Sequence, residues 1–402
     1  MVAGPVLAND QDLAKDTDLA FVSDVMRLSR LILLLSLGLV LFARPGFADT
    51  EVREEKLLLL IHVGSHDEKI ETLVVRPVVG NRFPIALIVN GSAASPSKMH
   101  PEWLAHMAHD FAHRGWLAAS IVWPGYGNST GKFMNRAGTC AAPNVAMFLD
   151  AHGNELAAAL TALRKRPDVD RSVVLGVGVS IGGASILDLS ARPGRPLTAA
   201  INISGGVYHY DRVGVPTPGC ALFKADLVGN MARFGKDNPT PTLWFYAAND
   251  PYFGPDLARR MVAAYRSRGG QADFVALPPF GTDGHTLFKQ KASPLMTPGI
   301  DAFLRQNRLP AMDDAALTPI LSRLGPADRA SAELYLKNDA EKAMAMPEKA
   351  RGIYWHYGAR SLDDARKQAL ATCQKATRQK CHLVAENTHP ADGWQRVVAG
   401  KE

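Results

Sequence analysis

Gly178-Val179-Ser180-Ile181-Gly182 carries the strongest structural signal in this chain. It follows the apolar run 173–177, which is typical of a buried strand, and precedes the small-residue segment 183–187, which is expected to be helical. A serine between two glycines at a strand-to-helix turn is the pattern of a nucleophile elbow, which holds the serine hydroxyl clear of the backbone. Glycine is expected at both flanking positions because a Cβ there would clash where strand and helix approach closely.

Strand and helix patterns alternate on both sides of this turn. The first two strands are expected to form a hairpin, and the later strands to be separated by helices. Such alternation predicts an α/β fold with a doubly wound, mainly parallel sheet and helices on both faces. The segment 208–237 lacks clear periodicity, and we expect a lid or a substrate-facing excursion there. The expected strands are 56–63, 70–75, 85–89, 116–122, 173–177, 199–203, 242–247 and 272–277, and the expected helices are 101–113, 144–166, 257–268 and 298–307.

A serine needs a base to accept its proton and an acid to orient that base. In doubly wound hydrolases these groups follow the serine in the order acid, then histidine, each just beyond a strand end. Asp250 follows the strand 242–247, and His285 lies on a glycine-containing loop after the strand 272–277. The sequence therefore predicts Ser180 as nucleophile, His285 as base and Asp250 as acid. Asp211 and Asp283 are the alternative acids.

A serine nucleophile also needs two N–H groups that stabilise the oxyanion formed during attack. The first is expected from Ile181, the residue after the nucleophile. The second is expected from the polar turn after the strand 85–89, where we favour the N–H of Ser92 and place Ala93 second. Trp123 and Tyr126 lie beyond the strand 116–122. They are candidate pocket residues, with packing in the core or at the rim as the alternative.

Five short motifs in this order give the chain a resemblance to the α/β-hydrolase superfamily, over residues 54–307. The resemblance is to bacterial members of the dienelactone-hydrolase-like and carboxylesterase-like kinds, and it implies a small-molecule ester substrate. Two positions depart from the family pattern: dienelactone hydrolases proper have cysteine at the elbow where this chain has Ser180, and many members have histidine in place of Asn90. The motifs are Asn90-Gly91-Ser92, Trp123-Pro124-Gly125-Tyr126-Gly127, the Gly178–Gly182 turn, Asn249-Asp250 and Asp283-Gly284-His285.

The N-terminal region has the pattern of an export signal. Arg27 and Arg30 precede the apolar run 31–42, and small residues follow up to Ala48. The run is shorter than the roughly 20 residues of a membrane-spanning helix. Because the residues before it are acidic, we expect translation to start at Met26 and cleavage to follow Ala48. The mature protein would then be periplasmic or secreted, without a stable membrane span; an uncleaved anchor is the alternative.

Four cysteines form an even set, which an oxidising compartment would pair. Three pairings are possible. Cys373 and Cys381 are near neighbours in the sequence, so we expect them to bond to each other. Cys140 would then pair with Cys220 and connect two loops on either side of the elbow strand. Neither pair has the spacing of a redox or zinc motif.

Four parts of the chain differ in character: residues 1–48 as N-terminal extension and signal, 49–309 as hydrolase domain, 310–350 as helical linker, and 351–402 as a small C-terminal module. In this module we expect a strand at 352–357, a helix at 361–376 and a strand at 380–385. Ser361 followed by Asp364 suits a helix start. The expected bond between Cys373 and Cys381 would stabilise so small a unit.

Histidines at 106, 109 and 113 share a helical spacing, with His100 just before them. We expect a polar helix face and no metal, because no carboxylate or cysteine completes a convincing ligand set, although Asp110 is nearby. The net charge of +6 comes from scattered residues and not from a basic stripe, which argues against nucleic-acid binding. No cofactor is implied.

Together these features predict an exported serine hydrolase that cleaves an ester, or less readily an amide or peptide, through an acyl-serine intermediate. An acyltransferase that uses the same three residues is one alternative. A protein of another class, a non-catalytic envelope-binding scaffold that acts through its C-terminal module, is the other. The sequence leaves the oligomeric state open.

Overall fold

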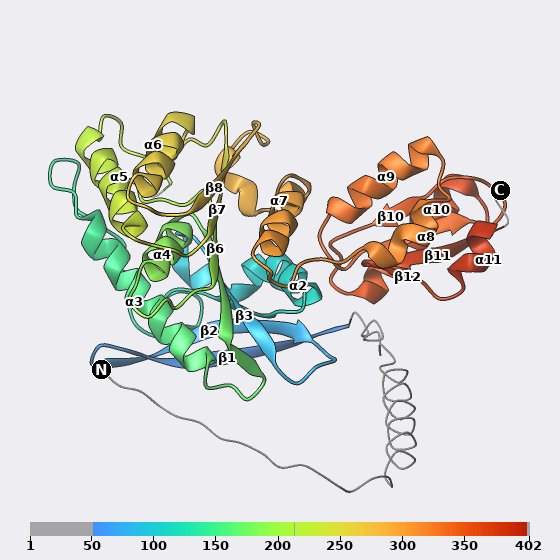
Figure 1. Ribbon diagram of the computed structural model, residues 1–402, viewed down its shortest axis with the longest axis horizontal. Coiled ribbons are helices and arrows are strands. Elements are labelled where there is room, and N and C mark those ends of the chain that lie inside the picture. Colours follow the sequence, from blue (N-terminus) through green and yellow to red (C-terminus); the bar gives the residue numbers. More distant parts are fainter. Residues whose placement is uncertain (1–50, 213, 400–402) are drawn as a thin grey trace, which may run out of the picture. The chain divides into compact units, whose positions relative to one another are not determined.

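The computed structural model describes residues 51–212 and 214–399 (Figure 1). The predicted start at Met26 and cleavage after Ala48 concern residues outside these ranges. Within them, none of the helices combines the length and the apolar character that crossing a membrane requires.

The larger sheet has eight strands in the order β1-β2-β4-β3-β5-β6-β7-β8. β1 and β2 form an antiparallel hairpin, and β2 also pairs antiparallel with β4, whereas all later pairs are parallel. This confirms the predicted doubly wound, mainly parallel sheet of an α/β-hydrolase fold. The strands are β1 (Val52–Val63), β2 (His66–Pro77), β3 (Phe83–Val89), β4 (Leu117–Ile121), β5 (Val169–Val179), β6 (Ala199–Ile203), β7 (Thr242–Ala247) and β8 (Ala272–Leu277).

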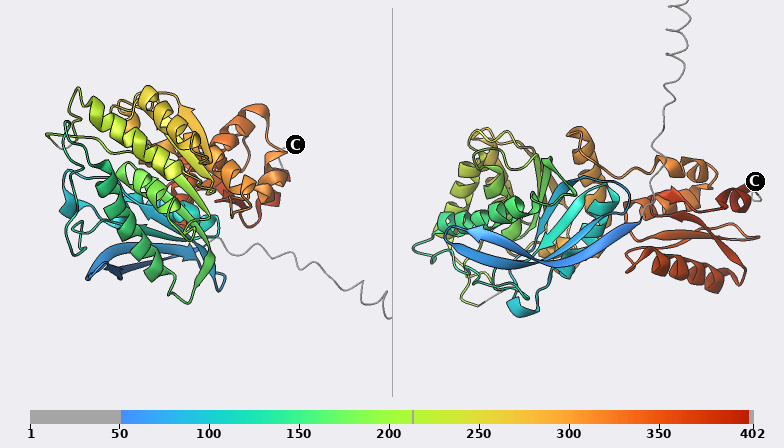
Figure 2. Two further views of the ribbon diagram at one scale, coloured as in Figure 1. Left: turned by 60° about the vertical axis from the view of Figure 1, so that its left-hand side comes forward. Right: turned by 90° about the horizontal axis from the view of Figure 1, so that it is seen from below.

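Helices cover both faces of this sheet (Figure 1, Figure 2). α3, α4, α5 and α6 share one apolar core with the sheet, and α2 and α7 share the other. Strand β3 shows why its sequence is a continuous apolar run: Leu87 and Val89 enter the first core, while Ala86 and Ile88 enter the second. The helices are α2 (Ala105–His113), α3 (Val145–Leu163), α4 (Ile181–Ser190), α5 (Ala221–Gly235), α6 (Pro255–Arg266) and α7 (Ser293–Gln306).

Helix α5 corrects the interpretation of segment 208–237, for which no regular structure was expected. The helix begins directly after Cys220, and its buried residues Phe223, Leu227 and Met231 recur at helical spacing. Before Cys220, the described residues 208–212 and 214–219 belong to no helix or strand. The predicted helix starting at Pro298 in fact begins five residues earlier, at Ser293.

The C-terminal residues form a second sheet, which is antiparallel and has the strand order β10-β9-β11-β12. The segment expected as a helical linker contains α8 and α9, but it also contains β9, which pairs with both β10 and β11. Leu317, Tyr335 and Met344 share one core with Val384, so this segment packs as part of the module. The elements are α8 (Thr318–Leu321), α9 (Pro326–Lys337), β9 (Ala343–Pro347), β10 (Tyr354–His356), α10 (Leu362–Thr377), β11 (Cys381–Glu386), β12 (His389–Pro390) and α11 (Trp394–Ala399).

Both predicted disulfides are present. Cys373 in α10 bonds to Cys381 in β11, and Cys140 bonds to Cys220 at the start of α5. Such links stabilise a fold mainly by restricting the unfolded chain. At the other end of α10, the Ser361 side chain accepts the N–H of Asp364 at 3.2 Å, as the sequence pattern predicted.

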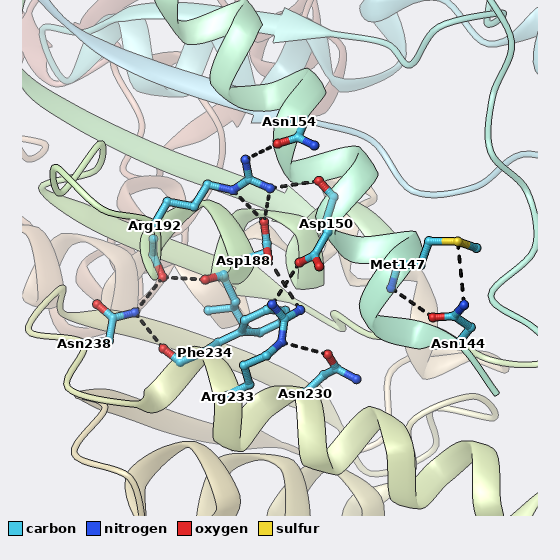
Figure 3. Close-up of polar contacts among 12 residues, drawn as sticks. Asn144, Met147, Asp150, Asn154, Asp188, Arg192, Asn230, Arg233, Phe234 and Asn238 are labelled. Carbon is cyan, nitrogen blue, oxygen red and sulfur yellow. Dashed lines mark hydrogen bonds and ion pairs between the residues drawn. The ribbon is translucent and has the colours of Figure 1, made fainter. Parts of the chain in front are cut away.

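A polar network fixes α4, the helix that follows the elbow serine, against α3 and α5 (Figure 3). Asp188 of α4 lies 2.7 Å from Arg192 and 3.8 Å from Arg233 of α5. Arg192 also donates to Asn154 and to the Asp150 carbonyl of α3, at 2.6 and 2.8 Å. The three helices are therefore held by charged hydrogen bonds and ion pairs as well as by apolar packing.

Candidate active site

Ser180 lies between β5 and α4 in a backbone conformation that is uncommon for a residue with a side chain. Its φ is 56° and its ψ is −122°. Backbone hydrogen bonds hold this conformation: the Ser180 N–H donates to Ile203 at 3.0 Å, and its carbonyl accepts from Ala184 and Gly206 at 3.2 and 3.1 Å. Strained backbone conformations persist only where the surrounding structure holds them in place, and they are concentrated at functional sites. The strain supports the predicted nucleophile elbow.

The glycines around Ser180 are required by close backbone approach. A Cβ on Gly178 would lie 2.2 Å from the Gly182 carbonyl oxygen, and one on Gly182 would lie 2.6 Å from the Asn90 carbonyl oxygen. Both distances are far below normal contact. Gly183 is equally restricted, because its Cβ would meet the Asn202 side chain at 2.2 Å. These distances confirm the prediction that a Cβ at either flanking position would clash.

His285 faces the serine from the loop after β8. Its Nε2 lies 3.0 Å from the Ser180 Oγ, which is hydrogen-bonding distance. The residue occupies a short 3-10 helix, Gly284–Phe288, and the Asp283 side chain caps this turn by accepting the His285 N–H at 2.9 Å. The Tyr252 ring packs on the imidazole, with ring centres 4.5 Å apart. The capped turn and the Tyr252 ring therefore both restrain His285.

Asp250, from the turn after β7, contacts the other nitrogen of this imidazole. Its Oδ2 lies 3.0 Å from His285 Nδ1, and its Oδ1 accepts the N–H groups of Tyr252 and Phe253 at 2.8 and 3.0 Å. The Asp250 side chain is fully buried. A buried carboxylate must be paired to be tolerated, and here each oxygen has its partners.

The two alternative acids occupy other positions. Asp283 bonds to the backbone of His285 and not to the imidazole. Asp211 is exposed and accepts the Thr217 hydroxyl at 3.0 Å. The structure brings Ser180, His285 and Asp250 together. Neither of the two alternative carboxylates is bonded to the imidazole of His285.

The loop after β3 lies directly against the serine. A Cβ on Gly91 would lie 2.8 Å from the Ser180 Cβ, so the backbone approaches as closely as an oxyanion donor must. The Ala93 N–H is already bonded to the Tyr126 hydroxyl at 3.2 Å, which leaves Ser92 as the better donor of the two. Ile181 is the first residue of α4, where an N–H has no partner within the helix.

Trp123 and Tyr126 are buried, and neither lines the two pockets that reach Ser92. The structure therefore does not place them in the pocket, as one prediction had it, but behind the loop that carries Ser92. The Trp123 Nε1–H donates to the Asn90 carbonyl at 3.0 Å, and the Tyr126 hydroxyl accepts the N–H of Ala93. Burial raises the pKa of Tyr126 to about 12, so its hydroxyl stays neutral at ordinary pH. Both rings hold the loop that carries Ser92.

Two pockets meet at Ser92. The first contains Ser180 and His285 and has an aromatic rim formed by Trp103, Tyr208, Tyr252 and Phe288. The second extends past Ile181 and is mainly apolar, with Phe133, Phe148, Val207 and Phe223 in its wall and Arg136 among its lining residues. The disulfide between Cys140 and Cys220 connects the two segments that provide much of this wall.

Sequence reasoning named none of these rim and wall residues, although Tyr208 and Phe223 lie in segment 208–237, for which a lid or a substrate-facing excursion was expected. Tyr208 and Tyr252 come shortly after the ends of β6 and β7, where ligands bind in open α/β sheets, so the strand-end rule contained a usable signal for them. Tyr208 shares a hydrogen bond with the Ser92 side chain, and burial raises its pKa to about 12. Phe133, Phe148 and Phe223 lie on a loop and on two helices, and no local pattern marks them.

The fold and these contacts together define a class: an α/β-hydrolase fold that carries a serine, histidine and aspartate arranged as a triad. Neither a family model nor a curated protein sequence matches the chain.

Solved structures similar to the chain include a protein from Klebsiella pneumoniae assigned as a dienelactone hydrolase, with 18% identity, a TM-score of 0.44 and coverage of 64% of this chain and 99% of that one. An esterase from Pyrococcus furiosus has 12% identity and a TM-score of 0.46, over 65% of this chain and 92% of its own. Est1E from Butyrivibrio proteoclasticus, with ferulic acid bound, has 14% identity and a TM-score of 0.43, over 62% and 98%.

Proposed function

We propose that this protein is an exported serine hydrolase that cleaves an ester, and less readily an amide or peptide, through an acyl-serine intermediate. One observation carries the proposal: the imidazole of His285 bonds to the Ser180 hydroxyl through one nitrogen and to the buried Asp250 carboxylate through the other, both at 3.0 Å. This geometry suits the transfer of the serine proton to the imidazole as the oxygen attacks.

In the first half of the reaction, Ser180 Oγ attacks the ester carbonyl carbon while His285 Nε2 accepts the serine proton. The same imidazole then returns the proton to the leaving alcohol, and the acyl group stays on the serine. In the second half, water attacks the acyl carbon and loses its proton to His285. Asp250 keeps the imidazole in the tautomer that has its free nitrogen toward the serine.

The negative oxygen that forms in each half lies between the N–H groups of Ile181 and Ser92 in this proposal. A donor of this kind typically lowers the barrier by about 3 kcal/mol. Because Trp123 and Tyr126 fix the loop from behind, the Ser92 N–H would be oriented before the substrate arrives. Such preorganisation avoids an energetic cost during the reaction.

The pockets support a small-molecule substrate. The apolar pocket past Ile181 suits a hydrophobic group next to the scissile carbonyl, and the aromatic rim around His285 suits the group on the other side. An acyltransferase would use the same acyl-serine and differ only in whether an alcohol replaces water in the second half. Export is part of the proposal because two disulfides are typical of proteins in an oxidising compartment.

A fluorophosphonate probe tests the proposal directly, since it reacts with an activated serine. We expect labelling of the folded protein, loss of labelling in Ser180→Ala, and unchanged labelling in Ser185→Ala, a buried serine on the same helix whose hydroxyl bonds to the Ile181 carbonyl. Hydrolysis of p-nitrophenyl esters of different chain length, compared with peptide substrates, then defines the bond that is cleaved.

The same assays distinguish the alternatives. Folded protein that neither labels nor hydrolyses any ester would contradict the proposal and favour the scaffold function. Labelled protein that forms mainly transesterified product when an alcohol is added would identify an acyltransferase. N-terminal sequencing of the exported protein tests the expected cleavage after Ala48.

A further inference from the structure

A second cluster of reactive side chains lies outside the catalytic site, where α2 meets the segment before β9. His109 and His113 are one turn apart on α2 and contact the same oxygen, Glu341 Oε1. The distances are 3.0 Å from His109 Nδ1 and 2.9 Å from His113 Nε2. The two imidazole nitrogens and the carboxylate oxygen are three potential metal ligands, and all lie within 4.8 Å of one another.

The cluster is well enclosed. The side chains of His113, Glu341 and His109 are 3%, 7% and 13% exposed. Glu341 also has a positive φ of 55°, a conformation that residues with side chains rarely adopt. Burial and a fixed backbone place the carboxylate oxygen between two imidazole nitrogens.

The two distances to Glu341 Oε1 are compatible with a metal site. In a tetrahedral zinc site with bonds of about 2.0 Å, neighbouring ligand atoms lie about 3.3 Å apart. The distances of 2.9 and 3.0 Å are within a few tenths of an ångström of that value. The second nitrogen of His109, Nε2, lies 2.6 Å from the Glu54 carboxylate of β1. Metal-bound histidines commonly donate their other N–H to a carboxylate, which fixes the tautomer.

We propose that His109 Nδ1, His113 Nε2 and Glu341 Oε1 bind a zinc ion, with Glu54 orienting His109. Two imidazoles and one carboxylate form a donor set that suits zinc, with a water molecule in the fourth position. Zinc would balance the charges of the two carboxylates while both histidines stay neutral. The groove lined by Glu54, His109 and Glu341 provides access for the ion and the water.

The site lies apart from the catalytic serine. None of its residues lines the pockets at Ser180. The three ligands come from α2 and from a segment 228 residues later in the chain, so the ion would fasten the C-terminal module to the hydrolase domain. The sequence prediction of no metal rested on the lack of a carboxylate or cysteine that completes a ligand set, and the fold brings Glu341 to the histidines.

Metal content tests this inference in the full chain, independently of ester hydrolysis. Protein stripped with dipicolinate is titrated with zinc against a chromophoric chelator, and with cobalt, whose visible absorption bands are intense when four ligands surround it. We expect one ion per chain, a four-coordinate cobalt spectrum, and a rise in Tm of roughly 3–6 °C at saturating zinc. Glu54→Gln should weaken binding roughly 10- to 100-fold.

Glu341→Gln and His113→Gln keep side-chain size and should abolish zinc uptake. His106→Gln, a histidine on the same helix outside the cluster, should retain it; circular dichroism checks that each variant is folded. Wild-type protein that takes up no zinc and gives no four-coordinate cobalt spectrum overturns the inference. So does uptake that the Glu341 and His113 variants retain in full. The wild-type cobalt spectrum decides the matter even if a variant does not fold.

Discussion

The triad and the cluster at Glu341 are built alike but arise differently from the sequence. The triad joins side chains from three segments and the cluster joins two histidines of α2 to Glu341, in both cases through contacts close to 3.0 Å. The triad residues follow the ends of β5, β7 and β8, so one edge of a parallel sheet collects them. Glu341 reaches His109 across 232 residues, through packing of the C-terminal module that no local motif announces. Contacts between residues at the ends of parallel strands can therefore be predicted from the sequence, whereas contacts across a domain junction cannot.

The largest expected effect separates the two aspartates near His285. Asp250→Asn should lower kcat for an ester by roughly 10³- to 10⁴-fold, because the imidazole loses the carboxylate that holds its tautomer. Asp283→Asn should lower it only a few-fold, since Asp283 caps the turn through the His285 N–H. Steady-state kinetics on both variants check this. Equal losses would mean that proximity to His285, and not contact with Nδ1, determines the acid.

The choice between these aspartates shows which parts of the site the sequence can predict. Chain order and strand ends predicted Asp250 over Asp283 and Asp211. They did not predict that Trp123 and Tyr126 turn inward to support the Ser92 loop, because a residue beyond a strand end can face either the pocket or the core. β9 was missed for another reason: Ala343-Met344-Ala345-Met346 has high helix propensity, and pairing with β10 and β11 overrides it.

A second prediction concerns a buried ion pair between the end of α2 and α7 in the hydrolase domain. Arg114, 2% exposed at the end of α2, bonds to both Asp301 oxygens at 2.8 and 3.1 Å. Arg114→Met should lower the free energy of unfolding by about 3–5 kcal/mol, because it leaves a buried carboxylate unpaired. Arg259→Met is the matched control: its partner Asp256 is 97% exposed, and a change below about 1 kcal/mol is expected. Denaturant unfolding measures both, and equal effects would show that burial does not determine the strength of these pairs.

A third prediction concerns the helix behind the nucleophile. Burial raises the pKa of the Asp188 carboxyl to about 6, although Arg192 opposes the shift. Since an unfolded aspartate has a pKa of about 3.9, the folded protein binds an extra proton between these values. The free energy of unfolding should therefore fall as pH rises from about 4 to about 6, by about 1–2 kcal/mol from this group. Asp188→Asn should lack that part of the slope; an identical slope in both proteins would assign the change to other carboxyls.

The smallest effect is expected at the loop that carries Ser92. Tyr126→Phe removes the hydroxyl that accepts the Ala93 N–H at 3.2 Å, and it leaves the apolar contacts of the ring in place. A net hydrogen bond of about 1 kcal/mol corresponds to roughly a five-fold change in rate if its loss loosens the oxyanion donor. Because the oxyanion exists only during the reaction, kcat should fall while KM stays constant. Tyr335→Phe, which loses a bond from its hydroxyl to the Asn387 carbonyl in the C-terminal module, is the control and should keep kcat. A rise in KM at constant kcat would instead place Tyr126 in substrate binding, as the sequence first suggested.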